Sequence, residues 1–148
     1  MIASDIMTRD LISCREDETI QAAAKTMIQK NIRGLPVLDS AGNLVGMITE
    51  SDFIGKHVDI PHAMVSVKEL LGEITFDGNI DEIFKKAKDR KLSEVMTKHI
   101  HTITPDSSIS TITEIMLEEN VSRLLVLDDG KLVGIVSKRD ILRSFANL

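Results

Sequence analysis

Two stretches of the chain decide its fold, GMITESD at residues 46–52 and GIVSKRD at residues 134–140. Each runs from a glycine through apolar residues to a hydroxyl residue, and then to an aspartate three positions later. The two stretches align without a gap at an offset of 88 residues. Self-similarity at a fixed offset is the signature of an internal repeat. The chain is therefore an internal duplication.

The duplication extends upstream of these two stretches. At an offset of 89 residues, the pair Met7-Thr8 returns as Met96-Thr97, and LPVLD at 35–39 returns as LLVLD at 124–128. The offset then falls to 88 because the following turn is one residue shorter in the second copy. Gly42 and Gly130 match across that turn, so we expect a tight hairpin connection in each copy.

Each copy predicts the order strand, helix, strand, strand, helix. We expect short strands at 11–14 and 100–103, and helices that begin at the acidic residues Asp17 and Asp106. Hairpins follow at 35–48 and 124–136, and the last helix opens near Thr49 or Ser137. Apolar residues at helical spacing predict one buried stripe on the first helix of each copy. The stripe residues are Ile20, Ala23, Ala24, Met27 and Ile28, and then Ile109, Ile112, Met116 and Leu117.

The repeats divide the chain into a first repeat at 1–55, a connector at 56–91 and a second repeat at 92–148. A repeat of roughly fifty residues has little room for a core of its own. We therefore expect an α/β (α+β) fold in which two pseudo-symmetric β-α-β-β-α repeats pack as one globular module. The connector is expected to be helical, with Pro61 in a first turn and an apolar stripe through Ile80, Ile83, Phe84 and Ala87. This stripe either covers an edge of the module or meets another chain.

Composition excludes several classes of protein. The 148 residues carry a net charge of −5, which argues against a broad surface for nucleic acid. With no Trp or Tyr and four Phe, stacking platforms for bases are also scarce. The chain has no apolar run of about eighteen residues and no signal-peptide pattern at its start, so we expect a cytoplasmic protein with no membrane contact. The lone Cys14 is expected to be a buried strand residue, which suits a reducing compartment.

In these motifs the chain resembles the tandem cystathionine-β-synthase (CBS) domain pair, also called a Bateman module. The resemblance rests on a Met-Thr element, an LPVLD-like strand and a Gly-to-Asp stretch, which occur twice in the same order. It implies a disc-like module with two clefts related by a pseudo-twofold axis, commonly a homodimer. Such modules bind adenosine-containing ligands such as AMP, ADP, ATP or S-adenosylmethionine. Most of them sense and do not catalyse, so we expect neither an enzyme nor an obligatory cofactor.

The residues themselves are suited to a ribose. A carboxylate at Asp52 or Asp140 can accept hydrogen bonds from both hydroxyls of a vicinal diol, while its charge would repel a 2′-phosphate. Thr49 and Ser137 stand three residues earlier, where their hydroxyls and the free N–H groups of a helix start can meet ribose or phosphate oxygens. The same spacing is also the outline of a helix capping box. Taken alone, the residues leave both interpretations open.

Carried over residue by residue, the resemblance implies two clefts, each shared between the repeats. The first, the Asp140 cleft, would contain Thr8, Ile12, Ile32, Arg123, Ile135, Ser137, Arg139 and Asp140. The second, the Asp52 cleft, would contain Arg33, Met47, Thr49, Asp52, Thr97, His101 and Val121. Arg123 matches a position where basic family members grip phosphate, although a solvated surface charge is the alternative. The first repeat has Gly34 there, with Arg33 one step earlier, so we expect the Asp140 cleft to bind more tightly.

Other chemistry has less support. The chain lacks the glycine-rich phosphate loop and the dinucleotide-binding turn, which counts against nucleotide hydrolases and dinucleotide oxidoreductases. His99 and His101 are close enough in sequence to share a metal, but we expect no metal and a cleft-wall role for His101. The basic run at 85–91 is interpreted as a solvated helix face, with a docking site for an acidic partner as the alternative.

These observations favour a stand-alone regulatory module. It would bind an adenosine derivative between its repeats and signal in trans to an effector protein whose identity the sequence does not give. The alternative is a structural module for dimerisation or assembly whose ligand sites are vestigial. A small enzyme is a third hypothesis, supported only by isolated Ser, His and Asp residues.

Overall fold

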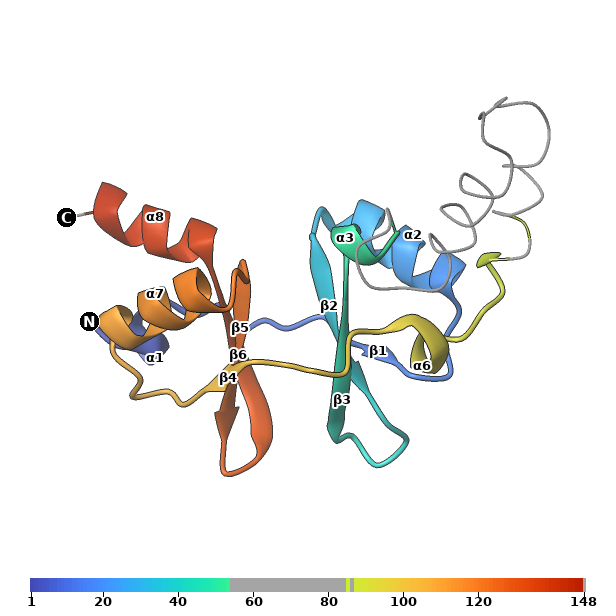
Figure 1. The fold of residues 1–148 in the computed structure, drawn as a ribbon, viewed down its shortest axis with the longest axis horizontal. Coiled ribbons are helices and arrows are strands. Elements are labelled where there is room, and N and C mark those ends of the chain that lie inside the picture. Colours follow the sequence, from blue (N-terminus) through green and yellow to red (C-terminus); the bar gives the residue numbers. More distant parts are fainter. Residues whose placement is uncertain (54–84, 86, 148) are drawn as a thin grey trace. The chain divides into compact units, whose positions relative to one another are not determined.

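The computed structural model describes residues 1–53, 85 and 87–147 (Figure 1). These residues form two compact units. The Asp52 unit comprises Ser13–His99, and the Asp140 unit comprises Met1–Ile12 and Ile100–Leu148. The first residues of the first repeat therefore belong to the unit that holds the sheet of the second repeat. The predicted connector, including Pro61 and the stripe residues Ile80, Ile83 and Phe84, lies outside the described residues.

The Asp52 unit is built on a three-stranded sheet in the order β1-β2-β3. Its strands are β1 (Cys14–Arg15), β2 (Gly34–Leu38) and β3 (Leu44–Thr49). β1 runs parallel to β2, and β2 pairs antiparallel with β3. The helices described in this unit are α2 (Ile20–Lys30), α3 (Glu50–Phe53) and α6 (Leu92–Val95).

The Asp140 unit repeats this plan around the sheet β4-β5-β6. Its strands are β4 (Thr102–Ile103), β5 (Arg123–Asp128) and β6 (Lys131–Ser137), and its helices are α1 (Ala3–Ile6), α7 (Ile109–Glu118) and α8 (Lys138–Ala146). The core joins residues of the sheet, α1 and α7: Ala3, Met7, Ile103, Ile112, Met116, Leu124, Val126 and Val136. The predicted mixed α/β class is confirmed, while the packing of the two sheets on each other stays a prediction.

The helices begin later than predicted. α2 and α7 start after Thr19 and Ser108, whose side chains accept hydrogen bonds from Ala22 N at 3.2 Å and Thr111 N at 3.1 Å. Asp17 and Asp106, the predicted starts, lie in the preceding turns. A hydroxyl positioned at the N-cap satisfies a free N–H group of the first turn. The cap position and not the nearest acidic residue therefore sets the boundary.

The buried stripes are also narrower than predicted. Ile28 on α2 and Leu117 on α7 occupy matching positions in the repeats, yet their exposed fractions are 83% and 72%. Met27 and Met116, one residue earlier, are only 5% and 2% exposed.

The first strand of each repeat is shorter than predicted. Strands were expected at 11–14 and 100–103, and the structure has two residues in each, Cys14–Arg15 and Thr102–Ile103.

The hairpin turns match the prediction. Gly42 and Gly130 have φ values of +84° and +77°, which a glycine adopts without steric cost. β2 and β3 therefore lie side by side, as do β5 and β6.

Each Met-Thr element packs against the sheet of the other repeat. Thr8 N donates to Ile135 O at 2.9 Å and Ile135 N donates to Thr8 O at 3.1 Å, so the first repeat extends the edge of β6. Thr97 and Met47 exchange the equivalent pair of hydrogen bonds at the edge of β3, both at 2.9 Å.

A methionine and a glycine make close contact beside each of these edges. A Cβ atom on Gly134 would lie 3.0 Å from Met7 Cγ, and one on Gly46 would lie 2.8 Å from Met96 Cγ and 3.0 Å from Thr97 O. The missing side chain therefore makes room for the methionine. Met7 is 9% exposed and Met96 is half-buried, so both methionines pack against these edges.

Candidate functional site

The Asp140 carboxylate lies at the start of α8, directly after β6. Ser137 is the N-cap residue of α8, and Asp140 is only 6% exposed. Asp140 Oδ2 accepts hydrogen bonds from Ser137 N at 2.8 Å and Ser137 Oγ at 2.6 Å, while Ser137 Oγ accepts one from Asp140 N at 3.2 Å. The capping interpretation of this motif is therefore confirmed. It uses one of the two carboxylate oxygens.

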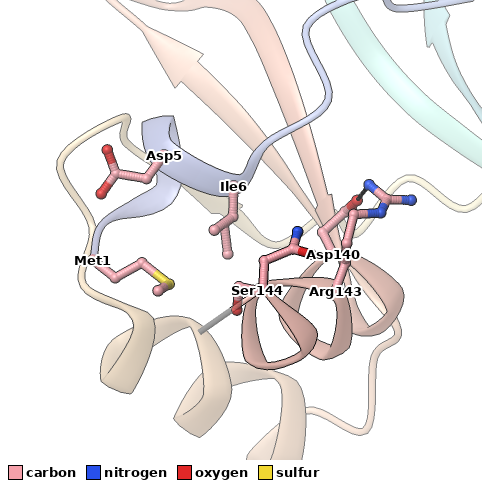
Figure 2. Close-up of a pocket in the computed structure, with 7 residues that line it drawn as sticks. Met1, Asp5, Ile6, Asp140, Arg143 and Ser144 are labelled. Carbon is pink, nitrogen blue, oxygen red and sulfur yellow. Dashed lines mark hydrogen bonds and ion pairs between the residues drawn. The ribbon is translucent and has the colours of Figure 1, made fainter.

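The second oxygen of Asp140 pairs with an arginine. Arg143 Nη1 donates to Asp140 Oδ1 at 3.1 Å, one helical turn further along α8 (Figure 2). The side chain of Asp140 is 7% exposed and that of Arg143 is 60% exposed, so a buried anion is paired with a cation at the surface. Our sequence reasoning missed Arg143. Its position three residues after an aspartate on a helix was the available signal.

The Asp52 carboxylate is engaged differently. Asp52 is 2% exposed, and its Oδ2 accepts hydrogen bonds from Thr49 N at 2.7 Å and Thr49 Oγ1 at 3.3 Å. Its Oδ1 accepts a hydrogen bond from Thr97 Oγ1 at 3.1 Å, a contact across 45 residues of sequence. Both oxygens therefore have neutral protein donors, and one of these donors comes from the second repeat.

The two sites thus differ in one partner. Thr97 corresponds to Thr8, but Thr8 is exposed, and Arg143 is the partner of Asp140 Oδ1. Arg143 in turn corresponds to Gly55 in the first repeat. The expectation that the sites are not equivalent began from Gly34 and Arg123, whereas the structure adds a second difference at Arg143.

Several predicted residues lie in the same unit as Asp140. Thr8 pairs with Ile135 through its backbone, and Arg123 opens β5 opposite Ser137 in the strand register. Arg139 is exposed on α8, directly before Asp140. The structure therefore places Thr8 beside the edge of β6 and Arg123 opposite Ser137, the residue that caps α8.

The remaining predicted residues are distributed over both units. Met47 is buried on β3, and the carbonyl of Arg33 accepts a hydrogen bond from Glu50 N at 3.2 Å, so both lie in the Asp52 unit. Ile32 is also in the Asp52 unit, while Ile12, His101 and Val121 are in the Asp140 unit. His101 Nε2 lies 3.7 Å from Glu119 Oε2, and Val121 packs against the core of its own unit. Their expected places in the clefts stay predictions.

A pocket of about 370 Å³ lies in the Asp140 unit (Figure 2). It is lined by Met1, Asp5, Ile6, Asp140, Arg143, Ser144 and Asn147. The amino-terminal segment contributes two apolar side chains and the carboxylate of Asp5, and α8 and its carboxyl end contribute polar side chains. The volume falls within the range of about 300–1,000 Å³ that is typical of small-molecule sites. The sequence did not predict this pocket.

Cys14 has no nucleophilic character in this fold. It is 4% exposed at the start of β1, and its thiol donates to Pro36 O at 3.6 Å. Burial, with a smaller contribution from the charge of Glu18, raises the pKa of the Cys14 thiol to about 12. The thiolate is the reactive form of cysteine, so the predicted structural role is confirmed.

Comparison with known proteins identifies the family. The model of the CBS domain family matches residues 3–59 and 92–147. The chain belongs to the CBS domain family. Each of the two matched segments contains one copy of the repeated motifs, and together they cover most of the chain.

Several known proteins resemble this one over nearly its whole length. The uncharacterized protein MJ1426 of Methanocaldococcus jannaschii is 30% identical over 97% of this chain and 90% of its own length. Among solved structures, the CBS domain of a CBS domain-containing membrane protein from Sphaerobacter thermophilus is 35% identical, with a TM-score of 0.72 over 97% of this chain and 86% of that one.

One solved relative contains ligands. The CBS domain pair of protein MJ0100, in complex with 5′-methylthioadenosine and S-adenosyl-L-methionine, is 27% identical, with a TM-score of 0.72 over 99% of this chain and 97% of that one.

Other curated relatives are far longer than this chain. This chain spans 23% of the homoserine O-acetyltransferase of Methanohalobium evestigatum.

Two further findings concern only the residues that the structure describes. Among them, no three His, Cys, Asp or Glu side chains are grouped so as to hold a metal ion. None of the helices formed by these residues combines the length and the apolar character needed to span a lipid bilayer.

Proposed function

We propose that this CBS domain protein is a regulatory module that binds an adenosine-containing ligand at the Asp140 carboxylate and signals to a partner protein in trans. The observation that carries the proposal is the Asp140 carboxylate itself, buried at the start of α8, with one oxygen in the helix cap and the other held by an exposed arginine. The complex of the MJ0100 CBS domain pair with two adenosine derivatives supports this ligand class.

The carboxylate has capacity for a ribose. A carboxylate offers about four acceptor positions, and Asp140 uses three of them, two for Ser137 and one for Arg143. A vicinal diol can take the remaining position and replace Arg143 at Oδ1. Because the acceptor is ionised, each such hydrogen bond is stronger than one between neutral groups.

The other predicted residues have roles in the same proposal. Thr8, Ile12 and Ile32 would flank the adenine, and Ile135 and Ser137 would complete the cleft beside Asp140. Arg123 would pair with a phosphate, with Arg139 as the weaker candidate. The expected ligands are AMP, ADP, ATP or S-adenosylmethionine. We also place the module in the cytoplasm, a compartment that suits the reduced thiol of Cys14.

The Asp52 site should bind more weakly. Its carboxylate is likewise buried and uses three acceptor positions, but the position that matches Arg123 is Gly34, so a phosphate would lack that basic partner. An incoming ligand there would rely on Arg33, Met47 and Thr49, and on His101 and Val121 if the predicted cleft forms. We expect this site to stay empty at ligand concentrations that fill the first.

Titration calorimetry with AMP, ATP, 5′-methylthioadenosine and S-adenosylmethionine tests the assignment. Asp140→Asn keeps a side-chain oxygen for the cap but removes the charge, and it should weaken binding at least tenfold, as expected for the loss of a charged hydrogen bond worth about 1.5–3 kcal/mol. The matched control is Asp128→Asn, the same chemical change at an exposed position of β5. An Asp140→Asn isotherm that equals the wild-type one rejects the assignment.

A second candidate function is assembly through homodimerisation. Leu142 and Phe145 lie one turn apart on α8 with exposed fractions of 69% and 65%, and an exposed apolar face is typical of a protein interface. Sedimentation equilibrium of the wild type and of Phe145→Asp tests this candidate. A wild type that is monomeric at every concentration would remove it.

A further inference from the structure

We propose that Arg143 makes the Asp140 site prefer phosphorylated adenosine ligands over uncharged ones. The inference rests on the proposed function, because it concerns the ligand class at the same carboxylate. Arg143 would act as a specificity residue by exchanging one anionic partner for another.

The geometry places Arg143 in competition with a ribose. Its Nη1 occupies Asp140 Oδ1 at 3.1 Å, the oxygen that the helix cap leaves available. Asp140 and Arg143 also line the pocket of about 370 Å³, whereas Thr8, Arg123 and Ile135 do not, so the ion pair borders an open space on one side (Figure 2). A diol that donates both of its hydroxyls to Oδ1 needs the acceptor position that Arg143 holds, so it must release the guanidinium.

The free-energy cost of releasing Arg143 from Asp140 depends on the charge of the ligand. An uncharged nucleoside takes the carboxylate and leaves Arg143 without its anion. A nucleotide takes the carboxylate through its ribose and offers a phosphate in return, and guanidinium binds phosphate through paired N–H donors. Since the Arg143 side chain is 60% exposed, it can turn from one partner to the other without unpacking the core. A cationic ligand also leaves Arg143 without its anion, and its positive charge in addition repels the guanidinium.

Among the residues that the structure describes, this device occurs in the second repeat only. The position of Arg143 corresponds to Gly55 in the first repeat, and Asp52 Oδ1 is held by the neutral hydroxyl of Thr97. A ligand at Asp52 would displace a hydroxyl and would release no cation. Discrimination by charge is therefore expected at the Asp140 site alone.

The test compares AMP with adenosine by titration calorimetry at constant ionic strength. In Arg143→Gln, adenosine should bind up to about fivefold more tightly, because a partly exposed ion pair no longer competes with it. AMP should bind about tenfold more weakly, because a charged hydrogen bond to phosphate is lost. Arg143→Lys should fall between Arg143→Gln and the wild type, since it keeps the charge but not the planar fork.

Lys131→Gln is the matched control, because it removes one positive charge at an exposed position of β6 in the same unit. It should leave the ratio of the two dissociation constants unchanged. A ratio that is also unchanged in Arg143→Gln overturns the inference while leaving the proposed function intact. A wild-type protein that binds neither AMP nor adenosine at millimolar concentration overturns both. Melting of each variant by circular dichroism verifies that α8 is retained.

Discussion

Substitution of Gly46 by alanine should destabilise the Asp52 unit through a steric clash. The new Cβ would lie 2.5 Å from Met96 Sδ, 2.8 Å from Met96 Cγ and 3.0 Å from Thr97 O. Met96 can rotate, but the carbonyl of Thr97 is fixed by its hydrogen bond from Met47 N at 2.9 Å. Overpacking of this kind costs about 1–3 kcal/mol, and alanine recovers about 0.4–1 kcal/mol by restricting the unfolded chain. At the middle of these two ranges, the free energy of unfolding should therefore fall by about 1.3 kcal/mol.

Urea denaturation followed by circular dichroism measures this loss without tryptophan. Truncation in Met96→Ala should relieve part of the clash, so the double variant Gly46→Ala/Met96→Ala should lose less stability than the sum of the single losses. Gly42→Ala is the control. It meets nothing within 4 Å but has a φ of +84°, so its loss comes from the backbone and should add to that of Met96→Ala. Additive losses for Gly46 and Met96 would refute the steric explanation.

Three further substitutions or conditions have defined outcomes. Thr97→Val should lower the free energy of unfolding by about 1.5–3 kcal/mol, because it leaves Asp52 Oδ1 buried without its donor, whereas Thr8→Val should have little effect in the same urea titration. Ser137→Ala should cost about 1 kcal/mol through loss of the α8 cap, and an unchanged melting temperature would contradict this. The raised pKa of Cys14 means that its thiol stays protonated in the folded protein up to a pH of about 12, so its contribution to stability is present below pH 9.0 and is lost as the pH rises from there. Thiol labelling at pH 8 should accordingly require unfolding, and rapid labelling of the native protein would contradict the assigned burial.

The sequence predicted those features that local chemistry determines. Hairpins at Gly42 and Gly130 followed from residue type, and the start of α8 at Ser137 followed from the cap pattern. The starts of α2 and α7 were misplaced because Asp17 and Asp106 compete with Thr19 and Ser108 as N-cap candidates in the same turn, and only backbone geometry distinguishes them. The exposed ends of the stripes, Ile28 and Leu117, depend on where the sheet stops covering each helix.

The contacts between distant segments were less accessible to sequence reasoning. Met7 and Gly134 both recurred in the duplication, but the pattern did not say that the methionine of one repeat fills the space above the glycine in the other. Such a contact depends on the pairing of Thr8 with Ile135 across the chain. The duplication identified Met7 and Gly134 as repeated residues, but their contact with each other follows from the strand pairing in the folded chain.

The two interpretations of the Asp140 motif, helix cap and ligand contact, turn out to be compatible. The sequence presented them as alternatives because both assign the same aspartate. A carboxylate has two oxygens, however, and the cap engages Oδ2 in both repeats. What distinguishes the repeats is the partner of Oδ1, which comes from three residues away at Asp140 and from 45 residues away at Asp52. One partner is an exposed cation that a ligand can displace, and the other is the neutral hydroxyl of a half-buried threonine. The difference in ligand affinity between the sites should therefore follow the Oδ1 partner and not the capping motif that they share.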